Sequence, residues 1–125
     1  MDAELVTFLT KFNQTRRMHR RNGPDFVDGT GDYGQGPDPD IIDSNQPAEG
    51  QPGLWCQWVP TPDGSAIEWD GGEKFYEAPR WMEYIINRYL VPKGHVCNGS
   101  IDAEGEDRYD NWTLTVKDNV VSTGR

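Results

Sequence analysis

The chain has 125 residues, a size that fits one domain with a single core, and only 34% of them are hydrophobic. Its formal net charge of −9 and isoelectric point near 4.5 argue against sequence-independent binding to nucleic acid through phosphates, which needs a net basic face. No segment approaches the roughly 20 apolar residues of a transmembrane helix and no secretory signal pattern is present, so we expect a cytoplasmic protein without membrane contact.

An amphipathic helix is predicted over residues 2 to about 20. Its apolar positions follow the i, i+3, i+4, i+7 spacing: Leu5, Phe8, Leu9 and Phe12. Acidic residues open the segment and arginines close it, which complements the helix dipole at both ends. The sequence Asn22-Gly23-Pro24 is typical of a helix end, because Gly accepts a left-handed conformation and Pro cannot continue the helix.

A long loop rich in Gly, Pro and Asp is predicted at about 22–53. Connections of this length without secondary structure are usually either functional or disordered. We favour a functional loop, because four apolar side chains provide anchors that can hold it in place: Phe26, Tyr33, Ile41 and Ile42.

A first hairpin is predicted from the strands Leu54–Val59 and Ala66–Trp69, joined across Thr61-Pro62-Asp63-Gly64. In that turn Pro presets the backbone and Gly accepts a positive φ. A second hairpin is predicted from Val96–Glu104 and Trp112–Val116, turning through residues 106–110.

A second helix is predicted between the two hairpins, beginning at Ala78-Pro79 and ending at Pro92-Lys93-Gly94. It has one apolar stripe: Met82, Ile85, Ile86 and Tyr89. The expected fold is therefore α+β in the order α-β-β-α-β-β, with a four-stranded, mostly antiparallel sheet covered on one face by two helices.

The two cysteines, Cys56 and Cys97, form no C-x-x-C pair. In a cytosolic protein such residues are more often buried thiols than a disulfide, and we expect thiols here.

The segments Trp55-Cys56-Gln57-Trp58-Val59-Pro60 and Ile67-Glu68-Trp69-Asp70-Gly71-Gly72-Glu73-Lys74-Phe75-Tyr76 resemble a family of small acidic proteins from bacteria, especially actinobacteria, and their phages. The likeness covers most of the chain. No activity is established for that family, so the resemblance implies a cellular setting and assigns no site residues. The relatives begin with an additional strand before the first helix. Its absence here implies an open sheet edge, from which we expect a homo-oligomer.

Basic side chains cluster near the end of the first predicted helix. Arg16, Arg17 and Arg20, with His19 and Arg21 beside them, are candidates for an anion clamp, because guanidinium groups bind phosphate or carboxylate bidentately. In the predicted helix, Arg16 and Arg20 lie one turn apart and are able to share one ligand. The alternative is that these side chains are solvated and complement the helix dipole.

Aromatic side chains are the second group of candidates. Alternation along a strand places Trp55 and Trp58 on opposite faces, so at least one indole ring of the first hairpin is expected outside the core, where it can stack on a ligand or partner. Packing of these rings in the core is the alternative. Together with the arginines, the expected ligand-binding residues are Tyr33, Trp55, Trp58, Trp69, Lys74 and Tyr76.

Residues 29–34 match G-x-G-x-x-G, but no buried strand precedes them and no helix follows, so a dinucleotide site is not predicted. A flexible or tightly turned loop is the simpler interpretation, and an anion-binding nest of backbone N–H groups is the functional one. Carboxylates gather at both hairpins, where solvated turns explain most of them. No catalytic or metal-binding motif is recognised, and no cofactor is expected.

Three functions follow from these features. The first is a non-enzymatic binding protein that sequesters a small anionic, nucleotide-derived ligand, and the phage setting implied by the resemblance makes it an antagonist of bacterial defence. The second is a protein-binding inhibitor of a host or defence nuclease that uses its acidic surface as a mimic of nucleic acid. The third is a small hydrolase with a carboxylate site.

Overall fold

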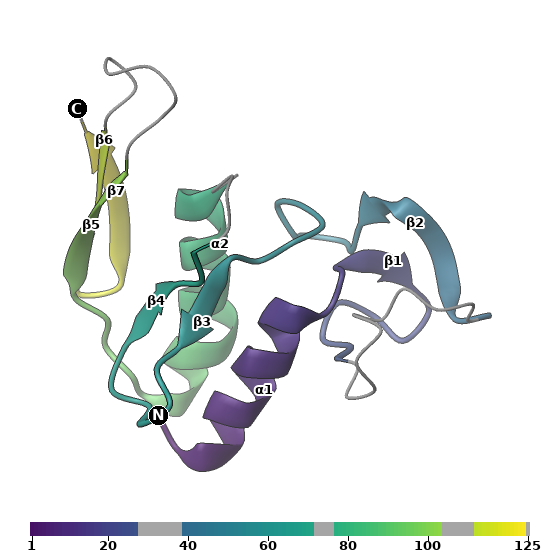
Figure 1. Ribbon diagram of the computed structural model, residues 1–125, viewed down its shortest axis with the longest axis horizontal. Helices are drawn as coiled ribbons and strands as arrows, with labels where there is room; N and C mark the ends of the chain where they lie inside the picture. Colours follow the sequence, from purple (N-terminus) through teal and green to yellow (C-terminus); the bar gives the residue numbers. More distant parts are fainter. Residues whose placement is uncertain (28–38, 72–76, 104–111, 125) are drawn as a thin grey trace. The chain divides into compact units, whose positions relative to one another are not determined.

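The computed structural model describes residues 1–27, 39–71, 77–103 and 112–124 (Figure 1). Two compact units make up the chain, Met1–Ala78 and Pro79–Arg125. The order of elements is α-β-β-β-β-α-β-β-β, with the strands in three separate sheets. The helices and strands are α1 (Ala3–Gln14), β1 (Met18–Arg20), β2 (Ile41–Pro47), β3 (Trp58–Pro60), β4 (Ile67–Trp69), α2 (Ala78–Ile85), β5 (Gly99–Ala103), β6 (Trp112–Lys117) and β7 (Val120–Gly124).

Helix α1 begins where the sequence predicted and ends earlier. The carboxylate of Asp2 accepts a hydrogen bond from the Leu5 N–H at 2.8 Å and caps the first turn. The predicted apolar stripe is confirmed for Leu5, Leu9 and Phe12, which are buried. Thr15 leaves the helical conformation, with φ −108° and ψ 130°. The prediction of a helix to about residue 20 is wrong, because this stretch finds backbone partners in other segments instead of in the preceding turn.

Strands β1 and β2 form a two-stranded antiparallel sheet with an irregular register, in which His19 is opposite Asp43 and Arg20 is opposite Ile41. Strand β2 lies inside the segment predicted as a loop. The strand has little apolar alternation because its central residues are exposed on both faces, so its sequence lacks the usual strand signal.

The first hairpin is confirmed as β3 paired with β4, with Trp58 opposite Trp69 and Pro60 opposite Ile67. Its first strand is shorter than predicted and begins at Trp58. The turn contains Gly64 at φ +74°, and the Gly64 carbonyl accepts a hydrogen bond from the N-terminal amino group at 2.9 Å. Helix α1 packs beside β3 in this unit (Figure 1).

The second helix begins at Ala78 as predicted. After Ile85 it continues as one π-helical turn, Ile86–Leu90, and a short 3₁₀ turn, Val91–Lys93. Gly94 ends it in the left-handed conformation at φ 78°. The predicted stripe is confirmed at Met82, Ile85 and Ile86, which are buried.

Strands β5, β6 and β7 form an antiparallel sheet in the order β5-β6-β7. The sequence predicted the first two and missed β7. Asp118 and Asn119, at φ 49° and 69°, form the two-residue turn between β6 and β7. A turn of this kind matches the twist of its two strands.

The predicted four-stranded sheet is wrong. The two predicted hairpins belong to different sheets. Strand β7 adds a third strand to the second hairpin, and β1 and β2 form a separate two-stranded sheet. Strand patterns in a sequence identify which segments are extended, but backbone pairing over a long separation depends on tertiary contacts that the pattern does not contain.

Candidate functional site

The three candidate arginines do not share one helix face, because α1 ends at Gln14. Arg17 is buried at 3% relative exposure. Its guanidinium group donates hydrogen bonds to the backbone carbonyls of Thr15 at 3.1 Å and Pro24 at 3.2 Å, and also to that of Phe26. It also lies 4.1 Å from the centroid of the Phe12 ring. Arg17 therefore holds the chain after α1 in place.

Arg20 is buried at 4% relative exposure. One of its nitrogens lies 3.8 Å from a carboxylate oxygen of Asp40, and its guanidinium carbon is 4.1 Å from the centroid of the Phe26 ring. The backbone reinforces this contact, since the N–H of Arg21 donates to the Asp40 carbonyl at 2.8 Å. Phe26 thus acts as an anchor of the segment predicted as a loop, and an arginine ion pair attaches the start of β2.

Arg16 is half-buried, and its Nε and Nη2 atoms both donate to the Ser44 carbonyl, at 3.2 and 3.1 Å. Each of the three guanidinium groups therefore has contacts inside unit 1. The prediction that Arg16 and Arg20 lie one helical turn apart is wrong, because neither residue is in a helix.

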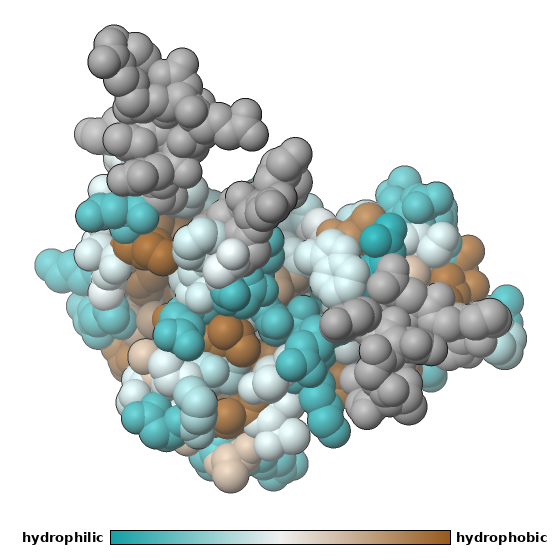
Figure 2. Space-filling view, in the orientation of Figure 1, coloured by the Kyte–Doolittle hydropathy of each residue, from teal (hydrophilic) through white to brown (hydrophobic). Residues whose placement is uncertain are grey.

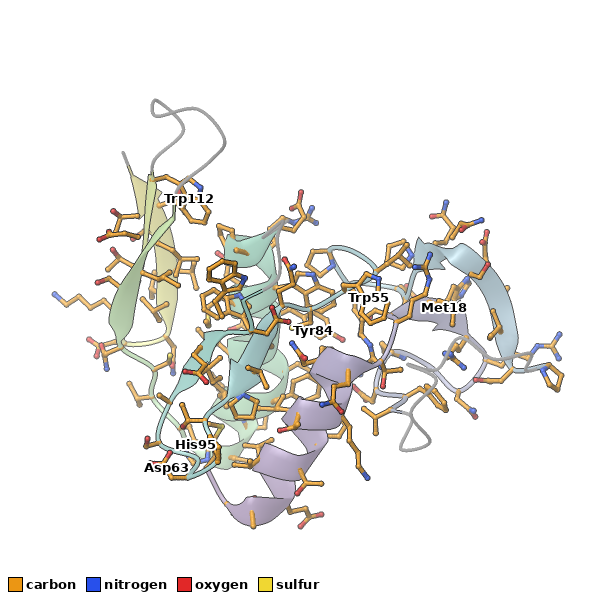
Figure 3. All side chains as sticks on the ribbon, in the orientation of Figure 1. Met18, Trp55, Asp63, Tyr84, His95 and Trp112 are labelled. Atoms are coloured by element: carbon orange, nitrogen blue, oxygen red, sulfur yellow. The ribbon has the colours of Figure 1, made fainter. Side chains whose placement is uncertain are left out.

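The aromatic candidates divide between the interior and the surface. Trp58 is buried at 4% relative exposure and its indole N–H donates to the Ala78 carbonyl at 3.0 Å. Trp55 and Trp69 are exposed, at 36% and 42%. Figure 3 shows Trp55 in the segment that joins β2 to β3. The expectation that one indole ring of this region lies outside the core is confirmed.

Three candidates, Tyr33, Lys74 and Tyr76, lie outside the described residues, as does the glycine motif at 29–34. The ligand-binding group predicted from the sequence is therefore seen only in part.

A residue that the sequence did not indicate, Asn13, connects α1 to the first hairpin. Its side-chain amide donates to the carbonyls of Cys56 at 2.8 Å and Trp58 at 3.2 Å, and to a carboxylate oxygen of Asp70 at 2.9 Å. Asn13 borders the apolar stripe of α1, four residues after Leu9, and its position gives no sequence signal for its partners, because they lie more than 40 residues away.

The cysteines are free thiols, as expected. Cys56 is buried, and its Sγ lies 3.7 Å from the Trp58 carbonyl. Desolvation raises the pKa of the Cys56 thiol to about 12, and burial also raises the pKa of Cys97. A thiol at pKa 12 is protonated at neutral pH, which makes Cys56 a poor nucleophile.

The described carboxylates of the first hairpin, Asp63, Glu68 and Asp70, belong to no group of metal-ligating side chains. Within residues 1–27, 39–71, 77–103 and 112–124, no group of three His, Cys, Asp or Glu side chains is arranged to hold a metal ion. Asp63, Glu68 and Asp70 are exposed. Hydrogen bonds from the backbone of Ser65 and from the hydroxyls of Thr61 and Ser65 lower the pKa of Asp63 to about 2.

Residues 39–71 of unit 1 contain no Lys or Arg. Their charged side chains are all acidic: Asp40, Asp43, Glu49, Asp63, Glu68 and Asp70. Apart from Asp40, which pairs with Arg20, these carboxylates are exposed. We call the exposed carboxylates of this segment, with Trp55 and Trp69, the acidic tryptophan surface. Figure 2 shows hydrophobic residues in small separate areas bordered by hydrophilic ones on the face in view.

Unit 2 contains an open hollow of about 400 Å³, lined by Pro79, Trp112, Thr123 and Gly124. Figure 3 shows Trp112 at the start of β6. None of the residues predicted to bind a ligand lies in this hollow, and its described lining has no charged side chain that favours an anion.

Among the described residues, no helix is long and apolar enough to cross a membrane. No family model, curated protein or solved structure matches the chain.

Proposed function

We propose that the protein is a non-enzymatic binding protein that docks its acidic tryptophan surface onto a basic face of a partner protein. The observation that carries this proposal is the exposure of Trp69, at 42%, on β4 of a segment whose charged side chains are all acidic. Tryptophan is enriched among the residues that dominate binding energy at protein interfaces. The acidic charge of residues 39–71 favours a basic partner and speeds its approach.

The contacts of Arg16, Arg17 and Arg20 within the chain favour a protein partner over a small anionic ligand. Arg17 and Arg20 are buried, and Arg16 donates to a backbone carbonyl, so their guanidinium groups already have partners in the chain. A ligand phosphate would have to replace these contacts and separate β2 from its anchors. Capture of a nucleotide by this cluster therefore requires these contacts to break.

A basic face on a protein partner commonly binds nucleic acid. The proposed mechanism is therefore competitive inhibition, in which exposed carboxylates occupy the sites that phosphates otherwise fill. The resemblance to proteins of bacteria and their phages makes a host or defence nuclease the natural target. Inhibition by this mechanism requires no catalytic residue in the protein.

The test first captures a nuclease from a lysate of a defence-bearing bacterium. Binding of the purified nuclease to variants of the intact chain is then measured. Trp69→Ala should weaken binding by about tenfold or more, the usual effect of removing a central interface tryptophan. Glu68→Lys should slow association and reduce the salt dependence of the rate. Val91→Ala is the matched control, because Val91 is a 48% exposed hydrophobic residue of the other unit.

Double-stranded DNA should compete with the protein for its partner. Equal binding by wild type and both hairpin variants would reject the acidic tryptophan surface as the interface.

A panel of cyclic and linear nucleotides tests the alternative, in which the protein binds a small anion. A rise in melting temperature with one nucleotide, lost in Arg16→Glu, would instead support sequestration of a small anion.

A further inference from the structure

Edge strands differ in whether they carry the features that prevent two sheets from pairing edge to edge. Charges, prolines and irregular register serve this purpose in natural proteins. Strands β1 and β2 pair with an irregular register, β3 contains Pro60, β4 contains Glu68 and β5 contains Asp102. Strand β7, with the sequence Val-Val-Ser-Thr-Gly, has no charge and no proline, and its register with β6 is regular.

The register of the β6–β7 hairpin shows which backbone groups face the open edge. Lys117 and Val120 flank the two-residue turn and are opposite each other, which makes them a hydrogen-bonded pair. Backbone direction alternates along a strand, so Ser122 also faces β6. The N–H and C=O groups of Val121 and Thr123 therefore point to the other side of β7, where the described strands include no neighbour.

We propose that β7 pairs with β7 of a second copy of this chain, antiparallel and centred on Ser122. In this register Val121 of each copy is opposite Thr123 of the other, and the two residues exchange both of their outward hydrogen bonds. A two-fold axis passes through the Ser122 pair, so the outward N–H and C=O groups of Val121 and Thr123 form the same hydrogen bonds in both copies. The two three-stranded sheets then form one continuous sheet.

Charge explains why two copies meet at this edge and not at another surface. A chain with a net charge of −9 repels itself, so two copies approach best through a surface that has no carboxylate. The side chains of β7 are uncharged and mostly β-branched, and Val120 is 67% exposed. β-branched side chains favour pairing in a sheet. This surface belongs to unit 2, so the inference is independent of the acidic tryptophan surface of unit 1.

A cysteine at the proposed axis tests the register directly. Ser122 is exposed and would lie opposite its own copy in a non-hydrogen-bonded pair, with Cα atoms about 4.5 Å apart, close enough for a disulfide. Mild oxidation of Ser122→Cys should give a covalent dimer on a non-reducing gel. Ser100→Cys, exposed on the opposite edge strand β5, is the matched control and should remain monomeric.

Sedimentation of the unmodified chain gives the second measurement, from about 10 µM to about 1 mM, a range that covers weak association. The wild type should shift from monomer to dimer. Ser122→Glu should weaken this association about fivefold or more by placing like charges opposite each other, whereas Ser100→Glu should leave it unchanged. A monomer at all concentrations would overturn the proposal. So would a Ser122→Glu variant that dimerises as tightly as the wild type, or a Ser122→Cys variant that does not cross-link.

Discussion

Arg17 and Arg20 stabilise the interior of unit 1, although arginine side chains usually lie on the protein surface. Arg17 and Arg20 are among the few charged residues buried in the described chain, and each lies against a phenylalanine ring. The planar guanidinium group suits both tasks, because it donates several hydrogen bonds in its plane and stacks on an aromatic face. Lysine, with a compact ammonium group, does not combine them.

Removal of the Arg17 guanidinium group should destabilise unit 1. We expect Arg17→Met to lower the free energy of unfolding by about 3 kcal/mol, because it keeps the apolar stem but removes the guanidinium donor from the carbonyls of Thr15 and Phe26, while the Pro24 carbonyl keeps its hydrogen bond from the Gln51 side chain. Arg21→Ala, which changes an exposed neighbour, should alter stability by no more than about 0.5 kcal/mol. Urea denaturation followed by tryptophan fluorescence measures both. Equal stability of the two variants would contradict the anchoring role.

At the scale of elements, the β3–β4 hairpin depends on close contacts at its turn. A Cβ atom built on Gly64 would lie 2.7 Å from the Met1 carbonyl oxygen and 3.1 Å from a methyl group of Val6. Gly64 also has a φ of +74°, which side chains disfavour. The turn is therefore shaped both by its own backbone and by the beginning of the chain.

We expect Gly64→Ala to destabilise the protein by about 3 kcal/mol, through backbone strain together with the steric clash. Gly50→Ala separates these two causes, because Gly50 has a similar φ of +81° but an added Cβ would meet no described atom within 4 Å. That variant should cost only about 1 kcal/mol. Thermal unfolding of both proteins measures the difference. If the two variants melt together, the contact with Met1 has no energetic importance.

Asp63 in the same turn makes hairpin stability depend on pH. Its pKa is lowered to about 2 in the folded state, first by the Ser65 N–H, whereas an unfolded Asp has a pKa of about 3.9. A lowered folded pKa means that the carboxylate stabilises the hairpin above about pH 4 and loses this contribution as the pH falls toward 2. Wild type and Asp63→Asn should therefore differ in stability at pH 6 and converge near pH 2. Denaturant titrations at a series of pH values test this, and parallel curves would contradict it.

For the whole molecule, the formal charge of −9 dominates its response to the solvent. Like charges repel more strongly in the compact state than in the unfolded chain, and salt screens this repulsion. We expect the melting temperature at pH 7 to rise as NaCl increases from about 10 to about 300 mM, the range over which the screening length falls most. Near pH 4.5, where the net charge approaches zero, the same salt increase should have a much smaller effect. An equal response at both pH values would show that self-repulsion does not limit stability.

The sequence by itself determined the features that depend on neighbouring residues. The start of α1 follows from the Asp2 cap and apolar periodicity, the first hairpin from its Pro-Asp-Gly turn, and the start of α2 from Ala78-Pro79. The expectation of an exposed indole ring in the first hairpin region also came from local alternation. Each of these signals acts over a few residues, where backbone geometry and side-chain periodicity are fixed by chemistry alone.

Only the tertiary structure decided which segments pair and what the arginines contact. Residues 18–20 form a strand instead of a helical turn because β2 supplies their backbone partners, and Arg17 is buried because the Pro24 and Phe26 carbonyls face it. Asn13 likewise finds its acceptors at Cys56 and Trp58. These contacts join residues separated by up to 45 positions or occur in segments without a periodic pattern. Their formation depends on the free energy of the whole packed unit, which no local sequence pattern specifies.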